Sequence, residues 1–375
     1  MQRCGHTTFT RAIPAVFING HKNSKTALSF GSSKAQHTLA SRRLLVAGPA
    51  MAAMDDDPTR SSEEEAIIID TPFFRIYSDR RIDRLVGTTT VPPGFDAATG
   101  VTSRDVTIDA DTGLYVRLYL PDTSGDNKDK KLPLLLYFHG GAFVTQSAAA
   151  PAYQPFLSAL SARAGLLVVS VNYRLAPEHP LPAGYSDSLR ALEWAVAGGD
   201  PWLSHHGDVS RVFLAGESAG GNIAHNVAMM AAGEAAAAIE GAALLHAGFS
   251  GREAVAGELP EWVETMGKLW AVVCPEAAAT GGADDPRMNP PASDLRRMPG
   301  RRVLVCAAEK DFGTPRCRAY YEALAASGWG GAAEWFVSEG EDHVFFLAKP
   351  GSDPAVEALM DRLVAFFTAS DADED

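Results

Sequence analysis

Short apolar runs recur through the central and C-terminal parts of the chain, and segments with a helical spacing of apolar residues lie between them. Runs that are apolar at every position are typical of parallel strands covered by helices on both faces. The runs span residues 134–138, 166–171, 212–215, 242–245, 303–307 and 335–337. The helical patterns span residues 155–164, 186–197, 223–232, 316–326 and 354–367. This alternation predicts an α/β fold with a mostly parallel, doubly wound central sheet flanked by helices.

Two further segments alternate between apolar and polar residues, which is the pattern of strands with one exposed face. They span residues 105–109 and 114–120 and are separated by a turn sequence, Asp-Thr-Gly, at residues 111–113. We expect an antiparallel hairpin at one edge of the sheet. The last helix is marked by Asp353 as its N-cap and by Pro354 in its first turn.

Two segments do not fit the alternating pattern. An apolar patch at residues 67–77 precedes the first sheet signal. It is either an N-terminal arm that packs over the functional site as part of a lid, or an ordinary edge hairpin, because residues 78–80 have the composition of a turn. Residues 250–285 follow a central strand and hold a helical piece and an Ala/Gly-rich loop. We expect this segment to be an inserted cap.

These patterns divide the chain into four parts. Residues 1–54 form an extension, residues 55–71 an acidic linker and the start of the lid, residues 72–368 the folded domain, and residues 369–375 an acidic tail.

The extension holds seven Lys or Arg and no acidic residue. That composition suits an organelle transit peptide, which would place the protein in a plastid. The alternative is an upstream extension of the gene model, with translation beginning at Met51 or Met54 and a cytoplasmic protein. The absence of an apolar core close to Met1 disfavours a secretory signal.

The formal net charge of −13 argues against nucleic acid as a partner. The longest apolar stretch, residues 44–54, is too short to span a bilayer. The spacing of the four cysteines fits neither a metal knuckle nor a disulfide framework, which favours a reducing compartment. Cys306 lies inside an apolar strand pattern, and we expect a buried thiol there.

The chemistry centres on the sequence Gly-Glu-Ser-Ala-Gly at residues 216–220, which lies between a strand pattern and a helical pattern. Strand, Gly-x-Ser-x-Gly and helix together are the setting of a nucleophile elbow. Gly216 and Gly220 flank Ser218 because side chains there would collide across the tight turn. The elbow predicts that the Ser218 hydroxyl is exposed at the tip, in front of a helix N-terminus that favours negative charge.

A serine hydroxyl needs a base, and the base needs an acid to hold its tautomer. His343 is the best base, since it follows the last strand pattern on a loop at the carboxyl end of the sheet. Asp311, after the strand at 303–307, is the best acid, because the order Ser, Asp, His is that of α/β-hydrolases. Asp342 and Glu309 are weaker alternatives for the acid.

The developing oxyanion needs hydrogen-bond donors, and a His-Gly-Gly-Ala-Phe sequence directly follows the strand at 134–138. Glycines without side chains let backbone N–H groups approach the oxyanion, so Gly140 and Gly141, together with Ala219, are the expected donors. His139 is assigned a structural role in holding this loop.

In combination, these motifs resemble the plant carboxylesterase family, in the hormone-sensitive-lipase-like branch of the α/β-hydrolases. The resemblance runs from about residue 72 to the final helix, and its motifs lie at residues 137–143, 172–179, 216–222, 309–311 and 340–345. It implies a cytosolic-type serine esterase with an N-terminal lid. Residues 246–249 depart from the family by lacking a proline and crowded aromatic residues, which leads us to expect a roomier pocket. The Ala/Gly loop at 280–283 is longer and looser than is usual.

The leading functional hypothesis is hydrolysis of small carboxylic esters through an acyl-enzyme, with no metal or cofactor implied. The first alternative is a binding protein, because the gibberellin receptors resemble this family; they have lost the triad histidine, whereas His343 is present here. The second is a dehydratase or an intramolecular acyl transfer in the same pocket, as in hydroxyisoflavanone dehydratases and lactone-forming tuliposide-converting enzymes. The sequence does not specify the natural ester or the oligomeric state.

Overall fold

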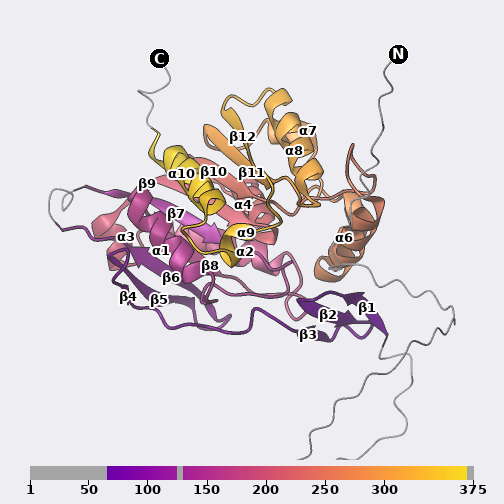
Figure 1. Cartoon of the computed structure of the whole chain (residues 1–375), viewed down its shortest axis with the longest axis horizontal. Helices are drawn as coiled ribbons and strands as arrows, with labels where there is room; N and C mark the ends of the chain where they lie inside the picture. The colour runs from indigo at the N-terminus through magenta and orange to yellow at the C-terminus, as the bar shows by residue number, and fades with distance from the viewer. Residues whose placement is uncertain (1–65, 125–129, 370–375) are drawn as a thin grey trace, which may run out of the picture.

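A computed structural model of the chain describes residues 66–124 and 130–369, and confirms the predicted α/β architecture (Figure 1). Within these residues, one sheet has the strand order β12-β11-β10-β9-β7-β8-β6-β5-β4, and a separate sheet has the order β1-β2-β3. The five strands from β12 to β7 pair in parallel with their neighbours, as does β8 with β7. The pairs β6–β8, β5–β6 and β4–β5 are antiparallel. The expected hairpin of residues 105–120 therefore lies near one edge of the large sheet.

The strands are β1 (Ile67–Asp70), β2 (Phe74–Tyr77), β3 (Ile82–Arg84), β4 (Phe95–Asp96), β5 (Val101–Asp109), β6 (Leu114–Leu120), β7 (Leu132–Phe138), β8 (Leu167–Asn172), β9 (Gly207–Glu217), β10 (Ile239–Leu245), β11 (Arg302–Ala308) and β12 (Ala332–Ser338).

The helices are α1 (Tyr153–Ala164), α2 (Ala183–Val196), α3 (Pro201–His206), α4 (Ala219–Met230), α5 (Gly233–Ala238), α6 (Pro260–Val273), α7 (Ala292–Leu295), α8 (Thr314–Ala326), α9 (Phe345–Ala348) and α10 (Pro354–Thr368), with two short 3-10 helices, η2 (Pro275–Ala279) and η3 (Gly282–Asp284). Asp353 caps α10, as expected, by accepting a hydrogen bond from Ala355 N at 2.9 Å.

The large sheet buries both of its faces, which is why its central strands are apolar at every position. In β7, Leu134 and Leu136 pack into the core that α2, α4 and α8 cover, whereas Leu135 and Tyr137 pack into the core under α1 and α10. Each fully buried side chain of this size stabilises the fold by roughly 1.5–3 kcal/mol relative to exposure. The two cores hold the carboxyl ends of the central strands rigidly, and the loops that carry the chemistry start there.

The apolar patch at residues 67–77 forms a hairpin, but not at the edge of the large sheet. Strands β1, β2 and β3 make their own antiparallel sheet, which lies beside α6 in Figure 1. The arm is tied to the domain by Arg84, which donates to Val144 O and to both carboxylate oxygens of Glu178. Thr145 Oγ1 also donates to Val86 O at 2.6 Å. That the arm acts as a lid remains a prediction.

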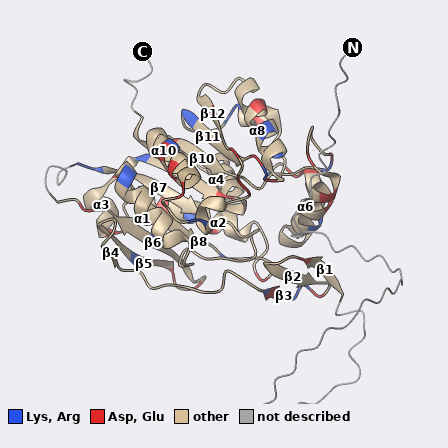
Figure 2. Cartoon of the chain, viewed as in Figure 1, with Lys and Arg blue, Asp and Glu red and all other residues tan. Residues whose placement is uncertain are grey.

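The segment between β10 and β11 carries α6, η2, η3 and α7, and that it is an inserted cap stays a prediction. Trp270 of α6 is buried, and its ring centroid lies 6.1 Å from that of Phe143 in the loop after β7. The helical piece expected within residues 250–285 is therefore confirmed. Figure 2 shows residues of both charge signs on α6 and α8.

Several expectations concern other parts of the chain. The extension at 1–54, the linker residues 55–65 and the tail residues 370–375 lie outside the described residues. None of the helices in the described part is long and apolar enough to cross a membrane. Cys306 is a fully buried free thiol, as expected, and Cys274 and Cys317 are buried free thiols as well.

Candidate active site

Ser218 stands at the junction of β9 and α4, in a backbone conformation that L-residues rarely adopt. Its φ is 54° and its ψ is −120°, a strained combination of the kind that persists only where surrounding contacts enforce it. Ser218 N donates to Leu245 O at 2.9 Å, and Gly248 N donates to Ser218 O at 2.8 Å. The end of β10 and the loop after it therefore hold the elbow in place.

The two flanking glycines are required by contacts with the backbone. A Cβ at Gly216 would lie 2.5 Å from the carbonyl carbon and oxygen of Gly220 and from Phe138 O. A Cβ at Gly220 would lie only 1.9 Å from Phe138 O. The predicted reason for these glycines, collision across the turn, is confirmed, and the end of β7 proves to be the second obstacle.

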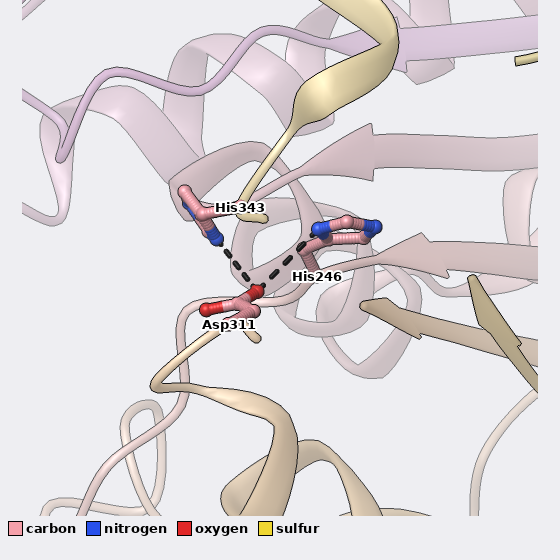
Figure 3. A group of neighbouring side chains, drawn as sticks. All are labelled: His246, Asp311 and His343. Carbon is pink, nitrogen blue, oxygen red and sulfur yellow. Dashed lines mark hydrogen bonds and ion pairs between the residues drawn. The ribbon is translucent and has the colours of Figure 1, made fainter. Parts of the chain in front are cut away.

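The predicted base and acid are joined by a hydrogen bond. His343, after β12, and Asp311, after β11, approach with His343 Nδ1 2.8 Å from Asp311 Oδ2 (Figure 3). Asp311 is only 6% exposed, and its other oxygen accepts Gly313 N at 2.9 Å. Of the weaker acid candidates, Asp342 is exposed, and Glu309 instead accepts Gly340 N.

Electrostatics favour an ionised Asp311 and a basic His343. Burial alone would raise the pKa of Asp311, but the charge and hydrogen bond of His343, with a contribution from the adjacent His246, hold that pKa well below its ordinary value. Burial opposes protonation of His343, yet the charge and hydrogen bond of Asp311, with a contribution from Glu217, raise the pKa of His343 above 6.5. A base of raised pKa that is oriented by a carboxylate is suited to accept a proton from a hydroxyl.

His246 is a third member of this group that the sequence did not indicate as such. It ends the β10 region with a φ of 49°, is buried, and places Nδ1 3.4 Å from Asp311 Oδ2 (Figure 3). The same nitrogen accepts Val344 N at 3.1 Å. Burial lowers the pKa of His246 despite the nearby Asp311, so its ring is neutral at neutral pH. The sequence signal was limited to its position directly after a strand pattern, because the neighbouring positions of β10 and β11, which bring residues after both strands together, are known only from the structure.

The remaining contact of the predicted triad stays a prediction. Among the described residues, the Ser218 side chain has no hydrogen bond, and His343 bonds only to Asp311. The His343 side chain is 39% exposed, so it is open toward the solvent side of the site. Catalytic hydrogen bonds to the nucleophile often tighten only when substrate is bound.

The loop after β7 corrects one predicted oxyanion donor. Gly140 N–H donates to a carboxylate oxygen of Glu217, which engages the only proton that this amide can offer. By contrast, the N–H groups of Gly141, Ala142 and Ala219 form no hydrogen bond within the described chain. Gly141 and Ala142 have φ values of 99° and 57°. Gly140 is needed instead for close approach, since a Cβ there would lie 3.2 Å from Ser218 Cβ.

His139 has the structural role that its position predicted. It is fully buried, and its ring stacks on Tyr173 with centroids 4.3 Å apart. Its backbone carbonyl accepts the Tyr173 hydroxyl at 2.7 Å. Burial lowers the pKa of His139 to about 4, so the ring stays neutral and anchors the loop.

His246, Asp311 and His343 are also the group in the described chain whose side-chain types and spacing could hold a metal ion, with ligand atoms within 4.8 Å of one another. The hydrogen bond between His343 and Asp311 gives the group an acid–base function that needs no ion. With a serine on a strained turn and free backbone N–H groups across from it, the arrangement is suited to acyl transfer.

Comparisons with known proteins bear on the fold and the family of the chain. A family model described as alpha/beta hydrolase fold matches residues 135–347. Tuliposide A-converting enzyme 2 (chloroplastic) of Tulipa gesneriana is 45% identical over 320 residues, which cover 82% of this chain and 81% of that protein. Probable carboxylesterase 2 of Arabidopsis thaliana is 39% identical over 302 residues, covering 79% of this chain and 94% of that protein.

Solved structures show the same fold. An esterase of Pyrobaculum calidifontis has a TM-score of 0.59 at 26% identity, covering 71% of this chain and 84% of its own. A thermostable esterase of Pseudomonas putida has a TM-score of 0.60 at 22% identity, covering 74% and 85%, a likeness that bears on the fold alone.

Proposed function

The chain belongs to the α/β-hydrolase family, and we propose that it hydrolyses small carboxylic esters with Ser218 as nucleophile, His343 as general base and Asp311 as the acid that orients it. The observation that carries the proposal is the hydrogen bond between His343 Nδ1 and the buried Asp311, at the same end of the sheet as the strained Ser218. The carboxylesterase and tuliposide A-converting relatives support the same class of reaction.

Each group has one task. Ser218 Oγ attacks the ester carbonyl while His343 Nε2 takes its proton, and Asp311 stabilises the imidazolium that forms. The imidazolium then protonates the departing alkoxide, which leaves the acyl group on Ser218. A water molecule, deprotonated by His343, attacks the acyl-enzyme and releases the acid.

The oxyanion of each tetrahedral intermediate is held by backbone donors. We assign this role to the N–H groups of Gly141, Ala142 and Ala219, which have no other partner in the described chain. Ala219 N lies at the start of α4, where the helix dipole adds to the attraction for negative charge. Losing one donor of this kind typically lowers turnover by about 10²–10³-fold.

A series of nitrophenyl esters of increasing acyl length tests the proposal. Wild type is expected to hydrolyse short acyl chains, and Ser218→Ala is expected to lose this activity. Ser210→Ala is the matched control, because Ser210 lies on the same strand but at its exposed start. Activity of Ser218→Ala at the wild-type level would refute the nucleophile assignment. Labelling of wild type with a phosphonate inhibitor would refute it as well if the covalent adduct formed on a residue other than Ser218.

A second reaction is favoured by the identity to tuliposide A-converting enzymes. In this reaction a hydroxyl of the substrate itself, instead of water, would accept the acyl group from Ser218. Product analysis with a 4-hydroxyacyl ester separates the two, since hydrolysis gives the free hydroxy acid and intramolecular transfer gives the lactone. Gibberellin binding without turnover of any ester would instead favour the receptor hypothesis.

We propose a plastid location on two grounds: the basic, acid-free residues 1–54 and the chloroplastic relatives from Tulipa. The mass of the N-terminal peptide from plant tissue tests this. A mature terminus downstream of residue 1 after import of the full chain supports the proposal. A start at Met51 or Met54 in protein that stays outside plastids contradicts it.

A further inference from the structure

Glu217, the residue before the nucleophile, has a carboxylate to which the hydrolytic mechanism assigns no step. It is 1% exposed, at the end of β9. One oxygen accepts Gly140 N–H and the hydroxyl of Tyr153 at 2.6 Å. The other accepts the hydroxyl of Tyr137 at 2.6 Å. Three donors from β7, the loop after it and α1 therefore converge on one buried carboxylate.

Burying a carboxylate costs free energy, so the contacts that compensate for it point to its role. A buried carboxylate is tolerated only where donors replace its lost hydration. Burial raises the pKa of Glu217, and the hydrogen bonds of Tyr137, Tyr153 and Gly140 oppose that rise. All three partners are neutral donors, which suits a carboxylate that accepts and does not donate. The arrangement fixes the position of the carboxylate.

The fixed carboxylate connects the two halves of the proposed oxyanion hole. Glu217 directly precedes Ser218 and lies two residues before Ala219, which supplies the donor on the elbow. Its hydrogen bond to Gly140 holds the residue directly before Gly141 and Ala142, the donors on the loop. The approach is close, because a Cβ on Gly140 would lie 2.8 Å from both Glu217 O and Oε1.

The loop needs such a restraint, because its conformation is strained. Gly141, Ala142 and Phe143 all have positive φ values, of 99°, 57° and 65°. Non-glycine residues keep this conformation only when their surroundings enforce it. On its other side the loop is held by the hydrogen bond of Arg84 to Val144 O.

We propose that Glu217 is a positioning residue that sets the distance between the elbow and the loop, so that the donors from both converge on the oxyanion. The inference rests on the proposed esterase function. Two expectations distinguish this role from a merely structural one. Loss of Glu217 should weaken stabilisation of the transition state rather than ester binding. The loss should depend on whether Gly140 N–H keeps an acceptor rather than on the charge of residue 217.

Two substitutions separate these roles. Glu217→Gln keeps an oxygen that can accept Gly140 N–H but removes the charge, whereas Glu217→Leu removes both. We expect Glu217→Leu to lower kcat by about 10²-fold with KM nearly unchanged, the size of effect that follows a displacement of about 1 Å in a catalytic site. Glu217→Gln should stay within about tenfold of wild type, because a neutral hydrogen bond replaces a charge-assisted one.

Reversible inhibitors provide the readout for the transition state. A short-chain trifluoromethyl ketone adds to Ser218 and forms an oxyanion, whereas the matching methyl ketone binds largely as a substrate-like ground state. Glu217→Leu should weaken the trifluoromethyl ketone by about 10²-fold and the methyl ketone by less than about threefold. Equal weakening of both, or weakening of neither in a folded protein, would overturn the inference. A Glu217→Gln variant as impaired as Glu217→Leu would also overturn it.

Substitution of the two tyrosines is a milder perturbation of the same site, because it keeps the Glu217 carboxylate. The double variant Tyr137→Phe/Tyr153→Phe leaves Glu217 with Gly140 alone, so we expect a smaller loss of the same kind, about tenfold in kcat. Tyr119→Phe is the matched control, because its buried hydroxyl bonds to Gln154 on α1 and not to Glu217. If Glu217→Leu does not fold, the double variant decides, and unchanged inhibitor affinities in it would reject the inference.

Amide hydrogen exchange keeps the inference distinct from the esterase proposal. In folded Glu217→Leu, exchange across residues 139–146 should be faster than in wild type, and Glu217→Gln should retain protection. Wild type that hydrolyses no ester refutes the proposed function alone, since the exchange result still reports on the restraint. Unchanged exchange in Glu217→Leu, with an active wild type, refutes the restraint alone.

Discussion

Gly220→Ala tests whether the position of the elbow relative to the end of β7 limits the rate. Gly220 lies in the first turn of α4, two residues after Ser218. A Cβ there would lie 1.9 Å from Phe138 O, 2.6 Å from Phe138 C and 2.8 Å from His139 O. All three are backbone atoms of the last residue of β7 and the residue after it, so no flexible side chain can move aside.

The structure determines the size of the displacement. Relief to an ordinary contact of 3.4 Å requires a shift of about 1.5 Å between α4 and β7. The loop with Gly141 and Ala142 continues directly from β7, whereas Ser218 and Ala219 move with α4. A misplacement of about 1 Å can lower turnover by about 10²-fold, so we expect kcat to fall by at least that factor. Overpacking of this kind destabilises a fold by roughly 1–3 kcal/mol.

The assay compares kcat and KM for a short-chain nitrophenyl ester with unfolding in urea. Gly330→Ala is the matched control, because a Cβ at Gly330 meets nothing within 4 Å, and this variant should keep wild-type kcat. A folded Gly220→Ala with kcat within about twofold of wild type would refute the reasoning. It would mean that the separation of elbow and loop does not limit the rate.

Two further predictions concern the acid and the arm. Asp311→Asn should lower kcat by about 10⁴-fold. Neutral His343 is the active form, and Asp311 raises the pKa of His343. The acid limb of the wild-type pH–rate profile should therefore rise through a pKa above 6.5, and the limb of Asp311→Asn should lie at lower pH. An acid limb that stays at the wild-type pH would contradict the assignment of this pKa shift to Asp311. Arg84→Met should lower the free energy of unfolding by about 1 kcal/mol, because it removes partly exposed hydrogen bonds to Val144 O and Glu178. Urea unfolding checks it, and an unchanged midpoint would show that these bonds do not hold the arm.

Much of the architecture could be predicted from local patterns. Apolar runs and helical spacing predicted the central strands and helices to within a few residues, because burial on both faces of a sheet leaves no polar positions. The elbow could also be predicted from the sequence, because its two glycines are required to avoid clashes that a Cβ would create in this turn. The pairing of Asp311 with His343 was predicted from the order Ser, Asp, His along the chain, and the structure places the two residues after neighbouring strands.

The arm and the oxyanion loop were less predictable. The apolar patch at 67–77 fitted an edge hairpin as well as a separate arm, because a strand's sequence does not name its partner sheet. The choice of Gly140 as an oxyanion donor was wrong for a related reason. Which amide in a loop faces the site depends on the local direction of the backbone. Here the Glu217 carboxylate, at the end of β9, accepts the hydrogen bond of Gly140 N–H.

By itself, the sequence determined the fold class, the elbow at Ser218 and the order of acid and base, because these depend on spacing along the chain and on sterics within a few residues. Only the tertiary structure decided that Glu217 accepts Gly140 N–H and that His246 joins Asp311. Hydrogen-bond partners distant in sequence are chosen by how strands are ordered in the sheet and by which polar groups burial leaves without water. These partners are set by tertiary packing, so no local sequence pattern indicates them.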